Sequence, residues 1–383
     1  MTGAAPLPSA GFDLAVVGAG IVGLAHALAA SRLGKRIVVI DRDAQANGAS
    51  IRNFGFITVT GQQAGACWRR AMRSRDIWLE VAPQARIEVV QSGLAVVARR
   101  RAAARVLEAF MATDMGRDCT FLDEAAARAR FPMFVGAISG VLWSPHDRRV
   151  ESRSAIPALA AWLADARDVT FVRGVEVFDV NPPHIETSAG QIEAETAIVC
   201  PGDDFTGLFA GRIASYGLSR CKLQMLRADD GPNLNLPCAV MTDLSLCRYL
   251  GYAELPESAG LKREFASEQS AHLAHGVHLI VVQSADGSLV IGDSHHYAAT
   301  PDPFGSSAVD DLILDEYVAV FGRRPRITER WTGTYASASD RLMLIDAPGA
   351  DTRLVMITSG TGASTAFAIA EEVVEEFYGL RVG

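Results

Sequence analysis

Short apolar runs separated by glycine turns dominate the pattern of this chain. Residues 12–17 and 37–41 are strand-length apolar runs on either side of a helix-length apolar stretch, which predicts a strand, helix, strand unit over 12–41. Helical periodicity predicts further helices over 64–81, 101–115, 151–166, 309–320 and 365–377. Further strands are predicted at 93–98, 169–180, 191–199, 277–283 and 288–291.

The first unit carries a dinucleotide-binding motif. Gly18 permits a tight turn, Gly20 lets the backbone approach a pyrophosphate, and Gly23 lets the helix pack closely on the strand. The N-terminus of the helix would face the phosphates with unpaired amides and the positive end of its dipole. Asp41 ends the second strand, where a carboxylate accepts hydrogen bonds from a ribose 2′-hydroxyl. We therefore expect an adenine dinucleotide without a 2′-phosphate.

Two later glycine turns extend this motif. The predicted strand 191–199 ends in Cys200-Pro201-Gly202, a turn that would return the chain to the cofactor after a long insertion. Near the C-terminus, Gly360-Thr361-Gly362 precede the last predicted helix, so amides there would face negative charge on the N1/O2 side of a reduced flavin. This second loop favours a flavin over a nicotinamide, although a plain helix cap rich in small residues is the alternative.

Composition narrows the class of protein. A chain of 383 residues with 49% hydrophobic residues is long enough for about two to three domains with cores of their own. A net charge of −8 argues against nucleic acid or an anionic membrane as a partner. The apolar stretch 12–30 has no basic residue before it and contains the phosphate loop, so we do not expect export, and no segment is long and apolar enough for a membrane span.

Cysteines and histidines give no metal-binding signature in the sequence. The six cysteines form no CxxC pair, which favours reduced thiols in a cytoplasmic protein. His272, His275 and His278 are spaced by three without accompanying cysteines or carboxylates, so we expect a solvated turn and no metal. No Gly-x-Ser-x-Gly elbow supports a hydrolase.

Taken together, the glycine motif at 18–23, Asp41, the turn at 198–202 and the loop at 360–362 resemble the D-amino acid oxidase and glycine oxidase family of FAD-dependent oxidoreductases. The resemblance covers nearly the whole chain. It implies an α/β fold with an α+β insert: a discontinuous Rossmann-like FAD-binding domain and an antiparallel-sheet substrate-binding domain. The FAD-binding domain would comprise 12–75, 146–215 and 325–383, and the substrate-binding domain 76–145 and 216–324.

The resemblance also implies the reaction and the cofactor contacts. A small amine would lose a hydride from the carbon that bears nitrogen, water would hydrolyse the imine to an aldehyde and an amine, and molecular oxygen or another acceptor would reoxidise FAD. Gly18, Gly20, Gly23 and Asp41 would hold the ADP half, and Val177 would meet the adenine through its backbone. The remaining expected FAD contacts are Arg42, Ser50, Arg52, Asn53, Gly202, Gly360, Thr361 and Gly362.

One departure from the family pattern concerns the substrate. Amino acid oxidases of the family carry Trp-x-Gly-Leu-Arg-Pro, in which the arginine clamps the substrate carboxylate with two hydrogen bonds. Here the segment is Trp331-Thr-Gly333-Thr-Tyr335, with tyrosine at the arginine position. Tyrosine offers neither the positive charge nor the pair of N–H donors of arginine, so an ordinary α-amino acid becomes doubtful as the substrate.

Other polar residues of the insert would replace the clamp if the substrate is anionic. The candidates are Tyr335 itself and Lys222, Gln224, Arg248, Tyr249, His295 and His296. Arginine, lysine and histidines suit a tetrahedral, multiply charged group, although one or both histidines are equally expected as pocket-wall or surface residues. Adjacent side chains on a strand point to opposite faces, so at most one of the two histidines should reach the site.

These segments, with Asn53 to Phe56 and Gly292 to His296, resemble a subgroup of the family associated with phosphonate breakdown. That resemblance implies an aminophosphonate substrate, such as 2-aminoethylphosphonate or its N-methyl form. Three alternatives stay open: a glycine, sarcosine or D-amino acid oxidase or dehydrogenase, a flavin dehydrogenase of 2-hydroxy acids, and a protein that binds FAD without oxidising an amine. A nicotinamide dehydrogenase would leave the loop at 360–362 unexplained.

Overall fold

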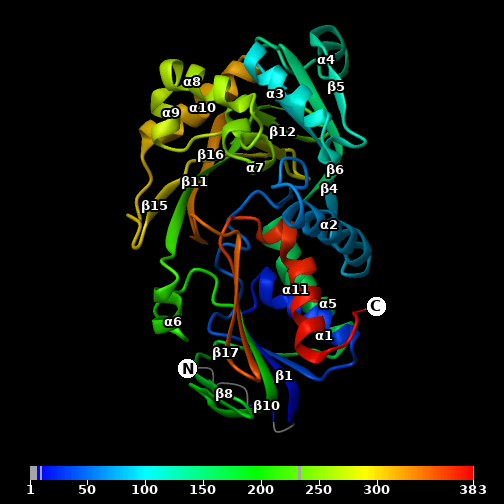
Figure 1. Cartoon of the computed structure of the whole chain (residues 1–383), viewed down its shortest axis with the longest axis vertical. Helices are drawn as coiled ribbons and strands as arrows, with labels where there is room; N and C mark the ends of the chain where they lie inside the picture. Colours follow the sequence, from blue (N-terminus) through cyan, green and yellow to red (C-terminus); the bar gives the residue numbers. More distant parts are fainter. Residues whose placement is uncertain (1–6, 9–10, 232–233, 383) are drawn as a thin grey trace.

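The computed structural model describes residues 7–8, 11–231 and 234–382. Two β-sheets organise this part of the chain and lie in the two halves of an elongated molecule (Figure 1). The sheet that contains β1 (Phe12–Val17) occupies the lower half of the view, and the sheet that contains β4 (Val89–Ala98) occupies the upper half.

The first sheet is the nucleotide-binding type that the glycine motif predicts. Its strand order is β17-β18-β10-β1-β2-β7, and the pairs from β18 to β7 are parallel. Helices α1, α2, α5 and α11 share one apolar core with Leu14 and Val16 of β1. The further bounds are β2 (Ile37–Asp41), β7 (Thr170–Arg173), β8 (Val177–Asn181), β9 (His184–Thr187), β10 (Gly190–Val199), β17 (Met343–Gly349), β18 (Thr352–Ile357), α1 (Ile21–Arg32), α2 (Ala66–Gln84), α5 (Ser152–Arg167) and α11 (Gly362–Tyr378).

The second sheet is mostly antiparallel. Its order is β15-β11-β14-β13-β12-β4-β6-β3, with β16 also paired to β11, β5 paired to β6, and β12 parallel to β4. Its strands are β3 (Phe56–Ile57), β5 (Thr120–Leu122), β6 (Gly140–Val150), β11 (Ser219–Asp229), β12 (Ala239–Thr242), β13 (Ile280–Gln283), β14 (Leu289–Gly292), β15 (His296–Ala298) and β16 (Arg326–Ser337). The other helices are α3 (Arg101–Met111), α4 (Glu124–Arg130), α6 (Ala210–Ser215), α7 (Leu250–Ala253), α8 (Ser258–Glu268), α9 (Ser270–Ala274) and α10 (Ser307–Phe321).

The predicted α/β fold with an α+β insert is confirmed. The five helices expected from periodicity are α2, α3, α5, α10 and α11, with ends that differ from the predicted ones by a few residues. The stretch 169–180 forms two strands, β7 and β8, because the chain turns at Gly174 with a φ of +68°. None of the helices in the described residues is long and apolar enough to cross a membrane.

Two strands of the second sheet come from segments that the sequence assigned to the FAD-binding domain. Strand β3, within 12–75, pairs with β6, and β16, within 325–383, pairs with β11 along most of its length. An apolar run shows that a strand is buried but not which sheet it joins, since tertiary packing decides the pairing. The domain boundaries themselves stay a prediction.

Candidate active site

A cavity of about 410 Å³ is lined by residues of both sheets. The first sheet contributes the β1–α1 turn and the loop between β18 and α11. The second sheet contributes segments around the ends of β13, β14 and β16. Most of the predicted cofactor residues line this cavity: Gly20, Gly23, Ser50, Arg52, Asn53, Gly202, Gly360, Thr361 and Gly362.

Two glycines at the β1–α1 turn, Gly18 and Gly23, leave no room for a Cβ atom. A Cβ on Gly18, where φ is +103°, would lie 2.5 Å from the carbonyl oxygen of Cys200, and a Cβ on Gly23 would lie 1.8 Å from the carbonyl oxygen of Gly18. Ser50 accepts a hydrogen bond from the amide of Ile21 (2.9 Å) across this turn. Helix α1 has no side-chain cap at Gly20, so its other first amides are available to an anion.

Four predicted cofactor residues do not line the cavity: Gly18, Asp41, Arg42 and Val177. Asp41 accepts hydrogen bonds from the amides of Ala19 (2.5 Å) and Asp43 (2.8 Å), so it joins the glycine turn to the end of β2. Arg42 pairs with Asp204 (2.5 Å). Val177 is buried in a core with Val38 and Ile40. Their contacts with FAD stay a prediction.

The loop before α11 faces the second sheet. A Cβ on Gly360, where φ is +72°, would lie 3.0 Å from Cζ of Tyr335. Tyr335 belongs to β16, and the end of that strand continues toward the loop through a bridge between Ser337 and Ser359. The glycine loop and Tyr335 therefore form one wall of the cavity.

Arg248 and two tyrosines form a polar cluster on this wall. Nη2 of Arg248 donates hydrogen bonds to the hydroxyl groups of Tyr297 (3.0 Å) and Tyr335 (3.2 Å). Burial raises the pKa of Tyr335 well above its usual value and also raises that of Tyr297, so both phenols keep their protons at neutral pH. Tyr297 and Tyr335 are both paired with Cys221 of β11, and the thiol of Cys221 lies beside the two phenols. Tyr249 lines the cavity beside them.

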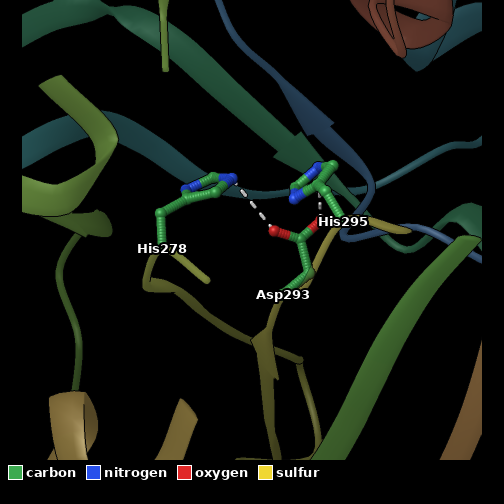
Figure 2. Close-up of side chains that lie close together, drawn as sticks. All are labelled: His278, Asp293 and His295. Atoms are coloured by element: carbon green, nitrogen blue, oxygen red, sulfur yellow. Dashed lines mark ion pairs between the residues drawn. The ribbon is translucent and has the colours of Figure 1, made fainter. Parts of the chain in front are cut away.

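A second cluster on the cavity wall consists of His278, Asp293 and His295 (Figure 2). Nε2 of His278 lies 3.0 Å from Oδ1 of Asp293, and Nε2 of His295 lies 3.7 Å from Oδ2. Burial raises the pKa of the Asp293 carboxyl, but the two histidines and Arg248 outweigh burial and hold that pKa below its usual value. Burial and the charge of Arg248 hold the pKa of His295 well below its usual value. The carboxyl is therefore charged and His295 neutral at physiological pH.

Three sequence-predicted substrate residues lie away from the cavity. Nζ of Lys222 donates to the carbonyl of Phe304 (2.9 Å), and Gln224 exchanges hydrogen bonds with the backbone of Ser306 (2.6 and 2.9 Å). Leu223, between them on β11, lines the cavity, so the strand's alternation turns its two neighbours to the opposite face. His296 likewise points away and meets His275 at 3.0 Å, whereas His295 lines the cavity.

The expected solvated turn at 272–278 is wrong for its last residue. His278 is buried, with 3% of its surface exposed, because it lies directly opposite Asp293 in the sheet. Asp293, His278 and Tyr297 were not among the sequence candidates, although Asp293 and Tyr297 belong to the same polar segment as His295. The signal that could have found His278 is the strand pairing of 277–283 with 288–291, which brings this histidine beside that segment.

A parallel nucleotide-type sheet, a crowded glycine turn, and a second sheet over the same cavity are the arrangement expected of a flavin-dependent oxidoreductase. The sequence matches the model of the FAD dependent oxidoreductase family (DAO) over residues 13–376, and the chain belongs to this family. FAD is therefore its cofactor, and the crowded Gly18 and Gly23 and the uncapped start of α1 fit the phosphates of that group.

Solved structures share this fold at low sequence identity. Glycine oxidase from Bacillus cereus ATCC 14579 is 16% identical, with a TM-score of 0.77 over 96% of this chain and 95% of that one. L-proline dehydrogenase from P. horikoshii is 17% identical, with a TM-score of 0.77 over 96% and 93%. L-alpha-glycerophosphate oxidase from Mycoplasma pneumoniae, with FAD bound, is 13% identical, with a TM-score of 0.75 over 96% and 95%. No curated protein matches the sequence.

Proposed function

We propose that this protein oxidises the C–N bond of a small amine that carries an anionic group, with an aminophosphonate such as 2-aminoethylphosphonate or its N-methyl form as the substrate. FAD, when bound, supplies a hydride acceptor. The protein then has to bind the amine, orient its carbon toward the cofactor and exclude water from the cavity. The imine product is hydrolysed to an aldehyde and an amine, and molecular oxygen or another acceptor takes the electrons.

The observation that carries this proposal is the cluster of Arg248, Tyr297 and Tyr335. Arg248 supplies a positive charge and further N–H donors beside two phenol hydroxyl groups, which suits the several oxygens of a tetrahedral phosphonate. The cluster adjoins Gly360 of the loop that the family pattern assigns to the flavin, since Tyr335 contacts that glycine. An anion held there would be close to the cofactor. The amine needs no side-chain base if it arrives neutral.

An amino acid is the second candidate, because a single arginine also binds a carboxylate. Glycine oxidase and L-proline dehydrogenase, whose names specify amino acids, have the same fold. L-alpha-glycerophosphate oxidase has it too, and its name specifies a phosphate-bearing alcohol, which keeps oxidation of a C–O bond as a third candidate. Arg248 would bind the anionic end in each case, so the reacting bond must be determined by experiment.

The test is the absorbance of the FAD-loaded protein under anaerobic titration. The compounds are 2-aminoethylphosphonate, its N-methyl form, glycine, sarcosine, a D-amino acid and glycerol 3-phosphate. Loss of the oxidised flavin band with a phosphonate alone is the expected result. Loss with glycine or sarcosine alone would retain amine oxidation and exclude the phosphonate. Loss with none of the amines, in a protein that holds FAD, would overturn amine oxidation, and admitting air afterwards shows whether oxygen is the acceptor.

A further inference from the structure

We propose that His278, Asp293 and His295 bind one divalent transition-metal ion of the zinc class in the wall of the cavity. This site is separate from the glycine cradle and goes beyond the proposed amine oxidation. All three side chains line the cavity, and their exposed fractions are only 3%, 4% and 7%. Figure 2 shows the two imidazoles on either side of the carboxylate.

The backbone places these three side chains on one face of the second sheet. His278 and Asp293 lie directly opposite each other next to the paired strands β13 and β14, and their backbones exchange two hydrogen bonds of 3.2 and 2.9 Å. Residues two apart on an extended chain share a face, so His295 joins Asp293 on the same side. The hairpin therefore holds all three potential ligand atoms within 4.8 Å of one another.

The hydrogen bonds around the cluster leave acceptor atoms facing each other. Nδ1 of His295 lies 3.0 Å from the carbonyl oxygen of Gly276, which can only accept, so Nδ1 carries the proton of the neutral ring. Nε2 of His295 then presents a lone pair toward Oδ2 of Asp293 at 3.7 Å. Oδ1 of Asp293 is buried and faces Nε2 of His278 at 3.0 Å. A cation between these acceptors would satisfy them.

His278 can supply the third acceptor. Its Nδ1 lies 3.1 Å from Oγ of Ser245, and that hydroxyl lies 3.5 Å from the carbonyl oxygen of Leu279, to which it can donate. In this arrangement Nδ1 of His278 donates to the serine and Nε2 faces the carboxylate with a lone pair. Histidines that bind metals hold their second ring nitrogen in this way, through a hydrogen bond to a carbonyl or another polar group.

The distances favour a metal ion over a substrate ammonium group. A metal about 2.1 Å from each ligand atom subtends about 90° between atoms 3.0 Å apart and about 125° between atoms 3.7 Å apart. Both angles are usual in metal coordination. An ammonium nitrogen about 2.8 Å from each acceptor would subtend only about 65° and 80°, well below the tetrahedral angle between its N–H bonds. The two distances run to different oxygens of Asp293, so the ligands would be two imidazole nitrogens and a carboxylate that contributes both oxygens, a set that suits Zn²⁺ and its neighbours.

Such a site would have an open coordination position toward the cavity. Zinc with three protein ligands binds a water or a substrate oxygen as its fourth ligand. Arg248 lines the same cavity as the three ligands. A role of the metal in holding a substrate oxyanion rests on the proposed function, whereas the presence of the metal does not.

The test measures metal binding by the FAD-loaded full chain after treatment with a chelator. Zn²⁺ content by mass spectrometry and the visible spectrum of bound Co²⁺ are compared for wild type, Asp293→Asn, His295→Gln and the control His296→Gln. The control removes one ring of the second close histidine pair, His275 and His296. We expect one Zn²⁺ per chain in wild type and the control, a tetrahedral Co²⁺ spectrum, and at least a tenfold weaker affinity in the two site variants, all at equal flavin content.

Two results would overturn the metal site. One is wild type that retains no Zn²⁺ at a tenfold excess, and the other is loss of the ion from His296→Gln while Asp293→Asn keeps it. If a site variant fails to hold FAD, His278→Gln gives the same comparison at the third ligand. These binding results are separate from the proposed function, because reduction of the flavin by an amine in chelator-treated protein would support amine oxidation whether or not the metal binds.

Discussion

Arg248→Met tests the proposed anion site most directly. The substitution keeps an unbranched apolar side chain and removes a guanidinium that donates to Tyr297 and Tyr335. In the proposed complex Arg248 also donates to the anionic group of the substrate, and a hydrogen bond to a charged group contributes about 1.5–3 kcal/mol. Loss of this bond to the substrate should raise the KM for an anionic substrate about 10- to 150-fold, at 1.4 kcal/mol per factor of ten. Because the contact holds a remote group in ground state and transition state alike, kcat should change much less.

The assay compares steady-state kinetics and flavin content in three proteins. Wild type, Arg248→Met and the control Arg324→Met are each measured with the substrate that bleaches the flavin and with ethylamine, which has no anion. Arg324 pairs with Asp311 on the surface, where an ion pair contributes little, so the control should match wild type. The expected rise in KM is confined to the anionic substrate. An unchanged KM at full flavin content would refute the anion site.

Three further predictions concern the cavity wall and the first unit. Tyr335→Arg should lower kcat/KM for the native substrate, because it puts a second cation beside Arg248 in a crowded wall; a higher kcat/KM would contradict this. Gly23→Ala should abolish FAD retention, because its Cβ would lie 1.8 Å from the Gly18 oxygen, whereas Gly211→Ala, with open space around its Cβ, should not. Burial lowers the pKa of His26 from 6.5 to about 4, so the stability it contributes above pH 6.5 is lost as pH falls toward 4, about 3 kcal/mol in total. His26→Gln should lose less stability than wild type between those values in denaturant unfolding, and equal losses would contradict this.

The first glycine turn could be predicted from sequence because its closest contact, between Gly23 and Gly18, is local, although the contact of Gly18 with Cys200 is not. Gly18 and Gly23 lie five residues apart, and the contact that forbids a Cβ on Gly23 is with the Gly18 carbonyl itself. A motif of this kind contains both partners of the interaction. The strand, helix and strand around it were predictable for the same reason.

Which residues line the cavity was harder to predict from the sequence. His278 and Asp293 are neighbours only through the register of β13 and β14, and the spacing of three among the histidines pointed to an exposed turn. For Lys222 and Gln224, the alternation of side chains along β11 was predictable, but not which alternate side chains face the cavity. The packing of the strand decides this: one face of β11 lies against the cavity and the other against the segment that precedes α10.

Strand β16 has a consequence for how the protein loses its cofactor. It is paired with β11 in the second sheet, carries Tyr335 against Gly360, and ends in the bridge from Ser337 to Ser359. Because β16 contacts both the second sheet and the loop before α11, these two walls of the cavity should unfold together. FAD at a hundred times its dissociation constant would then add about 2.7 kcal/mol to the free energy of unfolding of both walls. Without FAD, both walls should therefore be less stable by this amount, and the supply of FAD would affect how long the protein survives proteolysis.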